Sequence, residues 1–151
     1  MKNICRLQPE AHMFDDRSRL RVQPMELKPD ENGEKSMVVF KCSHMVDGEE
    51  VRYLEMWDTT DLPKIMSSEQ VGKLSSFDQA KLFASRKYVV SDAQGRVNFG
   101  KDLVEYLGDE KSVVTVPIIR ECCDGNVKGI AVWTGRDYVG HIDSKFAVKT
   151  R

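Results

Sequence analysis

Short segments in which apolar and polar residues alternate, or in which β-branched residues dominate, recur along the chain and predict β-strands. Residues 20–22 (LRV) and 97–99 (VNF) alternate in the way that half-buried strands do. Residues 37–40 (MVVF) and 113–119 (VVTVPII) are rich in β-branched side chains, which is typical of more deeply buried strands. The pattern therefore predicts a chain that is mostly β.

Two Asp-Gly dipeptides, at residues 47–48 and 124–125, predict tight turns. Each is followed by an apolar strand that ends in a tryptophan, Trp57 in the first case and Trp133 in the second. A tryptophan at the end of an apolar strand is most often a core or core-edge residue, and we expect this of both. The alternative is that the two indoles stack on nucleic-acid bases.

Between residues 58 and 84 the apolar spacing becomes helical and predicts two linking helices. Asp58 or Thr59 can cap the first, with Pro63 in its opening turn, and Ser75 or Ser76 can cap the second. The apolar positions expected to form a buried face are Leu62, Ile65 and Met66 in the first helix and Phe77, Ala80, Leu82, Phe83 and Ala84 in the second.

The sequence matches itself at a nearly constant shift, which indicates an internal duplication. The matches are DDRSRLRV (15–22) with DAQGRVNF (92–99), EKSMVVF (34–40) with EKSVVTV (110–116), and the strand ending at Trp57 with the strand ending at Trp133. The shift is 77 residues for the first match and 76 for the other two, so order and spacing are both kept. Each copy is too small to be stable alone, and the two are predicted to share one core.

The fold class predicted from these patterns is α+β, mostly β, with helices linking the two halves. We expect a single domain over residues 1–151. Its parts are a first repeat (12–66), a helical linker region (67–90), a second repeat (91–142) and a C-terminal tail (143–151). Residues 134–142 contain a short helical segment by pattern, and residues 144–151 alternate like an edge strand or a frayed tail.

Length and composition are those of a globular protein. The chain has 151 residues, of which 40% are hydrophobic and 31% charged, and a formal net charge of −1. No run approaches the about 18 apolar residues that a membrane helix needs, and the first residues lack the apolar stretch of a signal peptide. A cytoplasmic protein without membrane contact is therefore expected.

The spacing of cysteine and histidine predicts neither disulfides nor a metal site. Four cysteines in an intracellular chain are expected to be reduced, and two of them, Cys122 and Cys123, are adjacent. Cys42 and His44 form the only close Cys/His pair, which is fewer ligands than a structural zinc site needs. Phosphate-loop, dinucleotide-binding and hydrolase motifs are absent, so no catalytic residue, metal or cofactor is predicted.

A duplicated Asp-x-x-x-Arg motif is the most informative local feature, with Asp15 and Arg19 in the first copy and Asp92 and Arg96 in the second. If the first copy is extended, Arg17, Arg19 and Arg21 project from one face as a row of three guanidinium groups. Such a row suits phosphate contact, and arginine reads guanine edges in a major groove that admits a two-stranded β-ribbon. The structural alternative is that Asp15 and Arg19 only form a surface ion pair across a tight turn.

Charge is segregated along the chain. Residues 17–28 hold four basic residues and one acidic residue, and residues 81–101 hold five and one. Residues 30–61 hold nine acidic and three basic residues, and residues 102–124 hold six and two. The net charge of the chain is therefore the sum of basic and acidic segments that nearly cancel, which fits a molecule with one basic and one acidic face.

These features together resemble the MraZ family of the AbrB-like swapped-hairpin superfamily. The resemblance rests on DDRSR and DAQGR, on the EKS and Trp-ended strands, and on LSSFDQAKLFASRKYVV ahead of the second motif. It spans residues 12–142 and is clearest over residues 74–116. The family comprises bacterial transcriptional regulators of the division and cell-wall gene cluster.

The resemblance implies a tandem-repeat, double swapped-hairpin β-barrel whose halves intertwine. It also implies a ring-like homo-oligomer, associated with the nucleoid, that presents its Arg-bearing loops to direct-repeat promoter boxes in double-stranded DNA. The family's DNA-contact motif falls on Asp15, Arg19, Asp92 and Arg96, with the arginines contacting phosphate or guanine and the aspartates orienting them or fixing the turn. Arg17 and Arg21 are added as DNA contacts from strand geometry alone.

Ser18 stands where the family's motif usually has glycine, which predicts an altered first turn if that position needs a positive φ. The leading prediction is a sequence-specific DNA-binding transcriptional regulator. The alternatives are a protein-interaction or antitoxin-like module of the same superfamily without its own operator, and an enzyme that uses Cys122 or Cys123.

Overall fold

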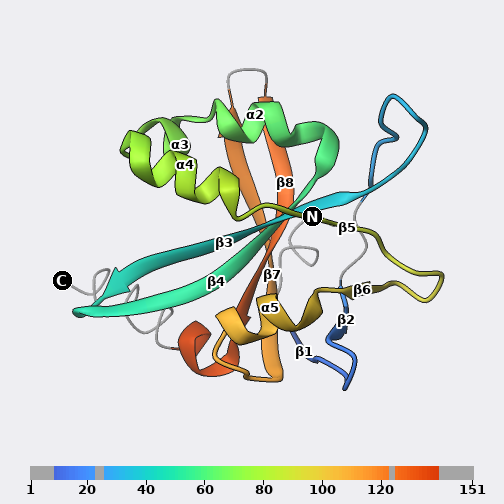
Figure 1. Cartoon of the computed structure of the whole chain (residues 1–151), viewed down its shortest axis with the longest axis vertical. Helices are drawn as coiled ribbons and strands as arrows, with labels where there is room; N and C mark the ends of the chain where they lie inside the picture. Colours follow the sequence, from blue (N-terminus) through green and yellow to red (C-terminus); the bar gives the residue numbers. More distant parts are fainter. Residues whose placement is uncertain (1–8, 23–25, 123–124, 140–151) are drawn as a thin grey trace, which may run out of the picture.

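The computed structural model describes residues 9–22, 26–122 and 125–139, and it is α+β with mostly strands, as the sequence pattern predicts (Figure 1). A two-stranded antiparallel ribbon is formed by β2 (Arg19–Arg21) and β6 (Arg96–Asn98). The main sheet is antiparallel, curled and six-stranded. Its order is β1 (Glu10–Met13), β7 (Ser112–Cys122), β8 (Gly125–Thr134), β4 (Glu49–Asp58), β3 (Met37–Val46) and β5 (Lys87–Val89).

Two long hairpins, β3–β4 and β7–β8, form the middle of this sheet and cross each other in Figure 1. Asp47 and Gly48 turn the first hairpin with φ angles of 52° and 84°, which confirms the Asp-Gly turn predicted there. The corresponding residue 124 lies outside the described residues. Trp57 and Trp133 are 0% and 6% exposed, so the prediction that both are core or core-edge residues is also confirmed.

The outer strands of the sheet pair across the two halves of the chain. β1 precedes the first Asp-x-x-x-Arg motif and pairs with β7, which follows the second motif. β5 precedes the second motif and pairs with β3, which follows the first. Each segment ahead of a motif therefore lies against the hairpin that follows the other motif.

The sheet is packed on both faces, and this explains why residues 37–40 are continuously apolar rather than alternating. Met37 and Val39 belong to one core cluster, together with side chains of β2, β6 and α5 (Gly100–Tyr106). Val38 and Phe40 belong to a second cluster, together with Trp57 and a side chain of α2 (Leu62–Met66). Because successive strand residues point to opposite faces, burial on both faces requires an apolar residue at every position.

The helices between the hairpins begin at the predicted caps. The Asp58 side chain accepts a hydrogen bond from the Thr60 amide at the start of η1 (Thr59–Asp61), which leads into α2 with Pro63 in its first turn. After α3 (Glu69–Gly72), the Ser75 hydroxyl accepts from the Asp78 amide at 3.0 Å and caps α4 (Ser76–Ala84). Both caps were predicted from the sequence.

Three features differ from the sequence prediction. Helix α4 has no fully buried residue and Phe77 is 75% exposed, so the expected buried face is wrong for most of this helix; of its predicted positions, Leu82 is partly buried and packs against the second core cluster. β5 lies within the segment expected to be helical, because the edge of β3 is available to pair with it. Helix α5 was not predicted; Leu103 and Leu107, one turn apart, bury it against the first core cluster.

None of the described helices is long and apolar enough to cross a bilayer. Residues 135–139 are helical directly after β8, and the Thr134 hydroxyl accepts a hydrogen bond from the Asp137 amide at 3.1 Å. This agrees with the short helical segment predicted there. Residues 140–142 and the predicted tail, residues 143–151, lie outside the described residues.

Candidate nucleic-acid interface

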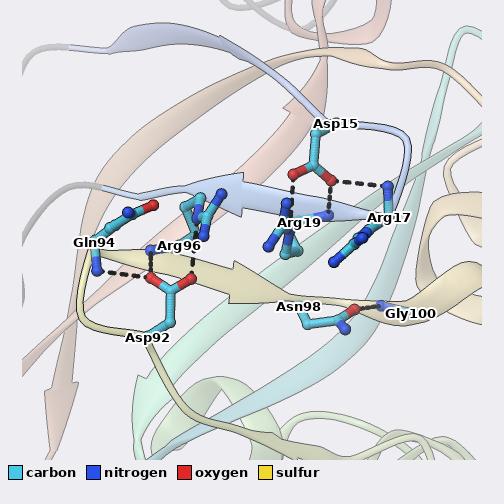
Figure 2. A network of polar contacts seen from close by, with 8 residues as sticks. All are labelled: Asp15, Arg17, Arg19, Asp92, Gln94, Arg96, Asn98 and Gly100. Atoms are coloured by element: carbon cyan, nitrogen blue, oxygen red, sulfur yellow. Dashed lines mark hydrogen bonds and ion pairs between the residues drawn. The ribbon is translucent and has the colours of Figure 1, made fainter.

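The first Asp-x-x-x-Arg motif forms a compact turn around the Asp15 carboxylate (Figure 2). Oδ1 accepts from the backbone amides of Arg17 and Arg19, both at 2.9 Å, and Oδ2 accepts from Nε of Arg19 at 2.8 Å. The Asp15 amide in turn donates to the Arg19 carbonyl at 2.9 Å. The carboxylate thus holds both the backbone of the turn and the guanidinium group.

The second motif repeats this arrangement atom for atom. The Asp92 carboxylate accepts from the amides of Gln94 and Arg96, both at 2.9 Å, and from Nε of Arg96 at 3.0 Å. The Asp92 amide donates to the Arg96 carbonyl at 2.8 Å. Each motif therefore places its arginine at the first position of a short strand, in the same orientation relative to its aspartate.

These hydrogen bonds stabilise the ionised form of both aspartates. The backbone amide of Arg19 makes the largest contribution that lowers the pKa of Asp15, and the amide of Arg96 does the same for the pKa of Asp92. Both carboxylates are thus anionic when the turns are formed at neutral pH.

The two motif arginines meet on one antiparallel ribbon, because β2 pairs with β6. Leu20 lies opposite Val97, and both are buried in the first core cluster at 1% and 0% exposure. The flanking pairs, Arg19 with Asn98 and Arg21 with Arg96, therefore point to the other face of the ribbon. Because the middle residue of each strand is apolar and buried, the side chains on either side of it must face outward.

Arg21 and Arg96 are directly opposite each other in the ladder. Side chains in such a pair have Cβ atoms about 5 Å apart, and like charges there destabilise the pairing. Arg96 is partly neutralised by Asp92, whereas the exposed side chain of Arg21 has no hydrogen-bond or ion-pair partner within the described part of the chain. The ribbon consequently presents an incompletely neutralised cationic face.

The expected single row of three arginines is wrong for Arg17. Asp15 draws the amides of both Arg17 and Arg19 toward one oxygen, so residues 16–18 form a turn rather than a strand. Arg17 is exposed at the end of the ribbon, while Arg19 and Arg21 lie on β2. The ion pair between Asp15 and Arg19, which the structural alternative requires, is present at 2.8 Å.

A third turn of the same design shows that the arginine is not needed to form it. The Asp30 carboxylate accepts from the amides of Asn32 and Glu34 at 2.8 and 2.9 Å, and the Asp30 amide donates to the Glu34 carbonyl at 2.8 Å. The fifth position here is Glu34, an anion that cannot pair with an aspartate. The backbone turn thus forms without an Asp–Arg ion pair. The arginines at the two ribbon turns are therefore not required for the turn itself.

Ser18 adopts the left-handed backbone conformation that glycine has in the other turns. Its φ is 61°, against 79° for Gly95 and 77° for Gly33. The amides of Ser18 and Gly95 also donate to equivalent carbonyls, those of Asp15 and Asp92, at 3.1 and 3.0 Å. The expectation of an altered first turn is therefore wrong: the turn is the same, and serine bears the conformational strain.

Ser18→Gly is expected to raise the free energy of unfolding by about 0.5 kcal/mol, because relief of the strain exceeds the entropy that glycine adds to the unfolded chain. The matched variant, Gly95→Ser, is expected to lower it by a similar amount; a Cβ at Gly95 meets no atom within 4 Å, so only backbone strain changes. Urea unfolding of both variants measures this. A Ser18→Gly variant with a lower free energy of unfolding than the natural chain would show that the backbone at Ser18 is not strained.

Sequence reasoning missed three features of this region. Gln94 and Asn98 occupy the positions equivalent to Arg17 and Arg21, and a comparison at the 77-residue shift would have shown them. The Asp30 turn, DENGE, has the same Asp-x-x-Gly pattern as DAQGR. Its fifth residue is glutamate, so the Asp-x-x-x-Arg pattern does not include it.

The other candidate sites do not join the ribbon. A cavity of about 550 Å³ lies between the β3–β4 hairpin, α4 and Tyr106, and none of the predicted site residues lines it. Cys122 is half-buried against the second core cluster, while Cys123 lies outside the described residues. Within the described ranges, no group of three His, Cys, Asp or Glu side chains is arranged to hold a metal ion.

The six residues predicted as DNA contacts are thus grouped at one place. Arg19, Arg21 and Arg96 share a face of the ribbon by their register. Figure 2 shows Asp15 and Asp92 holding Arg19 and Arg96, with Arg17 at one end of the ribbon. Comparison with known proteins adds no assignment: no protein-family model matches the chain, and no curated protein matches it.

Proposed function

We propose that this chain is a sequence-specific DNA-binding transcriptional regulator that contacts double-stranded DNA through the β2–β6 ribbon. The observation that carries the proposal is the cationic face of the ribbon, on which Arg21 lies opposite Arg96 and next to Arg19. A phosphate between these groups offsets their repulsion, and a guanine edge accepts hydrogen bonds from their N–H donors. A two-stranded ribbon also has the dimensions that the major groove admits.

The Asp30 turn supports a role for the arginines beyond the fold. Since Glu34 takes the fifth position there without loss of the turn, a polar residue at Arg19 or Arg96 satisfies the same backbone. Both ribbon turns nevertheless carry arginine, with Nε directed to the aspartate. In this role, the aspartate positions a guanidinium group whose remaining N–H donors contact DNA.

We further propose that the chain is an MraZ-like protein with the swapped-hairpin arrangement. The pairing of β1 with β7 and of β5 with β3 supports this, because each segment ahead of a motif contributes a strand to the hairpin that follows the other motif. The pseudo-two-fold relation of the ribbon supports it as well. The Ser18 carbonyl accepts from the Phe99 amide at 3.0 Å, and at the equivalent position the Gly95 carbonyl accepts from the Val22 amide at 3.4 Å.

Charge arithmetic favours weak binding by one chain and stronger binding by an assembly. Residues 15–22 and 92–99 together hold four arginines and three aspartates, so the ribbon gains little from bulk attraction. A ring-like homo-oligomer that engages several direct-repeat promoter boxes at once multiplies such weak contacts. We place this assembly on promoter DNA in the cytoplasm, associated with the nucleoid.

A protein-interaction module is the second candidate function. Helix α4 favours it: Phe77 and Phe83 on the helix are 75% and 38% exposed, and Leu74, directly ahead of its cap, is 38% exposed. Exposed apolar side chains grouped on one element are typical of protein contact surfaces. The two functions separate experimentally, because only the first requires DNA.

Binding to labelled duplexes tests the proposal. The protein is titrated into a duplex from upstream of its own gene and into a shuffled duplex of equal length and composition, from about 50 to about 200 mM salt. We expect tighter binding to the upstream duplex and an affinity that falls with salt. Equal affinity for both duplexes, or no binding at the lowest salt, would contradict the proposal and favour the protein-interaction module.

A further inference from the structure

The two ends of the β2–β6 ribbon have the same backbone but different side chains. At the 77-residue shift, Arg17 corresponds to Gln94 and Arg21 to Asn98, while Arg19 corresponds to Arg96. The amides of Arg17 and Gln94 donate to equivalent aspartate oxygens at the same distance, 2.9 Å. The difference between the ends is therefore one of side-chain chemistry alone.

Arg17 and Gln94 lie at opposite ends of the ribbon (Figure 2). Both are exposed, and neither side chain has a hydrogen-bond or ion-pair partner within the described residues. A symmetric ribbon would present the same groups to both halves of a palindromic DNA site. Here one end has the guanidinium of Arg17 and the other has the amide of Gln94.

These two groups match different bases. A guanidinium only donates, and two parallel N–H groups fit the O6 and N7 acceptors of guanine. A glutamine amide both donates and accepts, which fits N7 and the N6 amino group of adenine. The other amide, that of Asn98, lies at the Arg17 end of the ribbon opposite Arg19, and its carbonyl oxygen already accepts from the Gly100 amide at 3.0 Å. Gln94 therefore carries the less restricted of the two amides, at the end where Arg21 lies opposite Arg96.

We propose, on the basis of the DNA-binding function proposed above, that Arg17 and Gln94 are specificity-determining residues that give the bound DNA a direction. The Arg17 end lies over guanine, and the Gln94 end lies over adenine. The target of one chain is therefore non-palindromic, although the ribbon itself is nearly two-fold symmetric.

Selection from a random duplex library tests this, with the full chain and the variants Gln94→Arg and Arg17→Gln. Each substitution introduces the residue that the chain already carries at the equivalent position, so the turn accommodates it, and thermal unfolding checks that it does. We expect the natural chain to enrich guanine at one end of its motif and adenine at the other. Gln94→Arg then changes the adenine to guanine and Arg17→Gln changes the guanine to adenine, each with a shift in base preference of about tenfold.

The outcomes distinguish this inference from the function on which it rests. A motif that is palindromic, or that both variants leave unchanged, overturns the inference while DNA binding stands. A natural chain that enriches no sequence above the input overturns the proposed function and the inference together.

Discussion

Replacing both Arg19 and Arg96 with alanine will weaken binding to the upstream duplex by about 100-fold or more, because two charge-assisted contacts are lost. The slope of log affinity against log salt will fall by about two, one for each phosphate contact, if both arginines bind phosphate. Fluorescence anisotropy across a salt series measures both quantities. The fold will persist, because the Asp30 turn forms with Glu34 at the equivalent position.

A matched control removes two arginines elsewhere. Arg86 stacks on the Phe83 ring at 3.9 Å, and the Arg136 side chain is 78% exposed, so Arg86→Ala/Arg136→Ala makes the same change in charge outside the two motifs and the strands β2 and β6. Binding by this control will stay close to that of the natural chain. Equal losses of affinity in the two double variants would show that binding depends only on net charge. An unchanged affinity in Arg19→Ala/Arg96→Ala would show that these two arginines do not contact the DNA.

Gly129→Ala will lower the free energy of unfolding by about 2 to 3 kcal/mol through overpacking. Gly129 lies opposite Trp57 in the β4–β8 ladder, and an added Cβ would lie 2.5 Å from both the Met56 carbonyl oxygen and Cε3 of Trp57. Trp57 is fully buried, so the ring has no room to yield. At the equivalent place in the other half, Tyr53 instead stacks on Trp133, with ring centroids 4.2 Å apart.

Gly135→Ala is the control, since a Cβ there meets no atom within 4 Å and the residue is helical. It will change the free energy of unfolding by less than about 0.5 kcal/mol or stabilise the chain, as alanine does in helices. Urea unfolding of both variants gives the comparison. A Gly129→Ala variant as stable as the natural chain would mean that Trp57 is not packed against this glycine.

The elements predicted from the sequence are those with a local signal. The β-branched run at residues 37–40, the Asp-Gly turn at residues 47–48 and the Ser75 cap each depend on neighbouring residues, and each is confirmed. The features missed depend on distant packing. Whether Phe77 is buried is decided by what covers α4, and whether residues 87–89 form a strand is decided by the free edge of β3.

The candidate site was predicted in part for the same reason. The aspartates and arginines of the two motifs are visible in the repeat, but their meeting on one ribbon depends on the pairing of β2 with β6. Alternation alone suggested a row through Arg17, since it takes no account of the turn that the Asp15 carboxylate imposes. That Arg21 lies opposite Arg96, the observation on which the proposed function rests, follows only from the register of the β2–β6 pairing, which the sequence does not reveal.

The central claim is that DNA lies on the β2–β6 ribbon, and backbone amide NMR spectra with and without the upstream duplex test it most directly. We predict that the largest shifts will occur at residues 15–21 and 92–98, with little change at the Asp47–Gly48 turn of the β3–β4 hairpin. Shifts confined to α4 or to the hairpin turn, with the ribbon amides unchanged, would contradict the account.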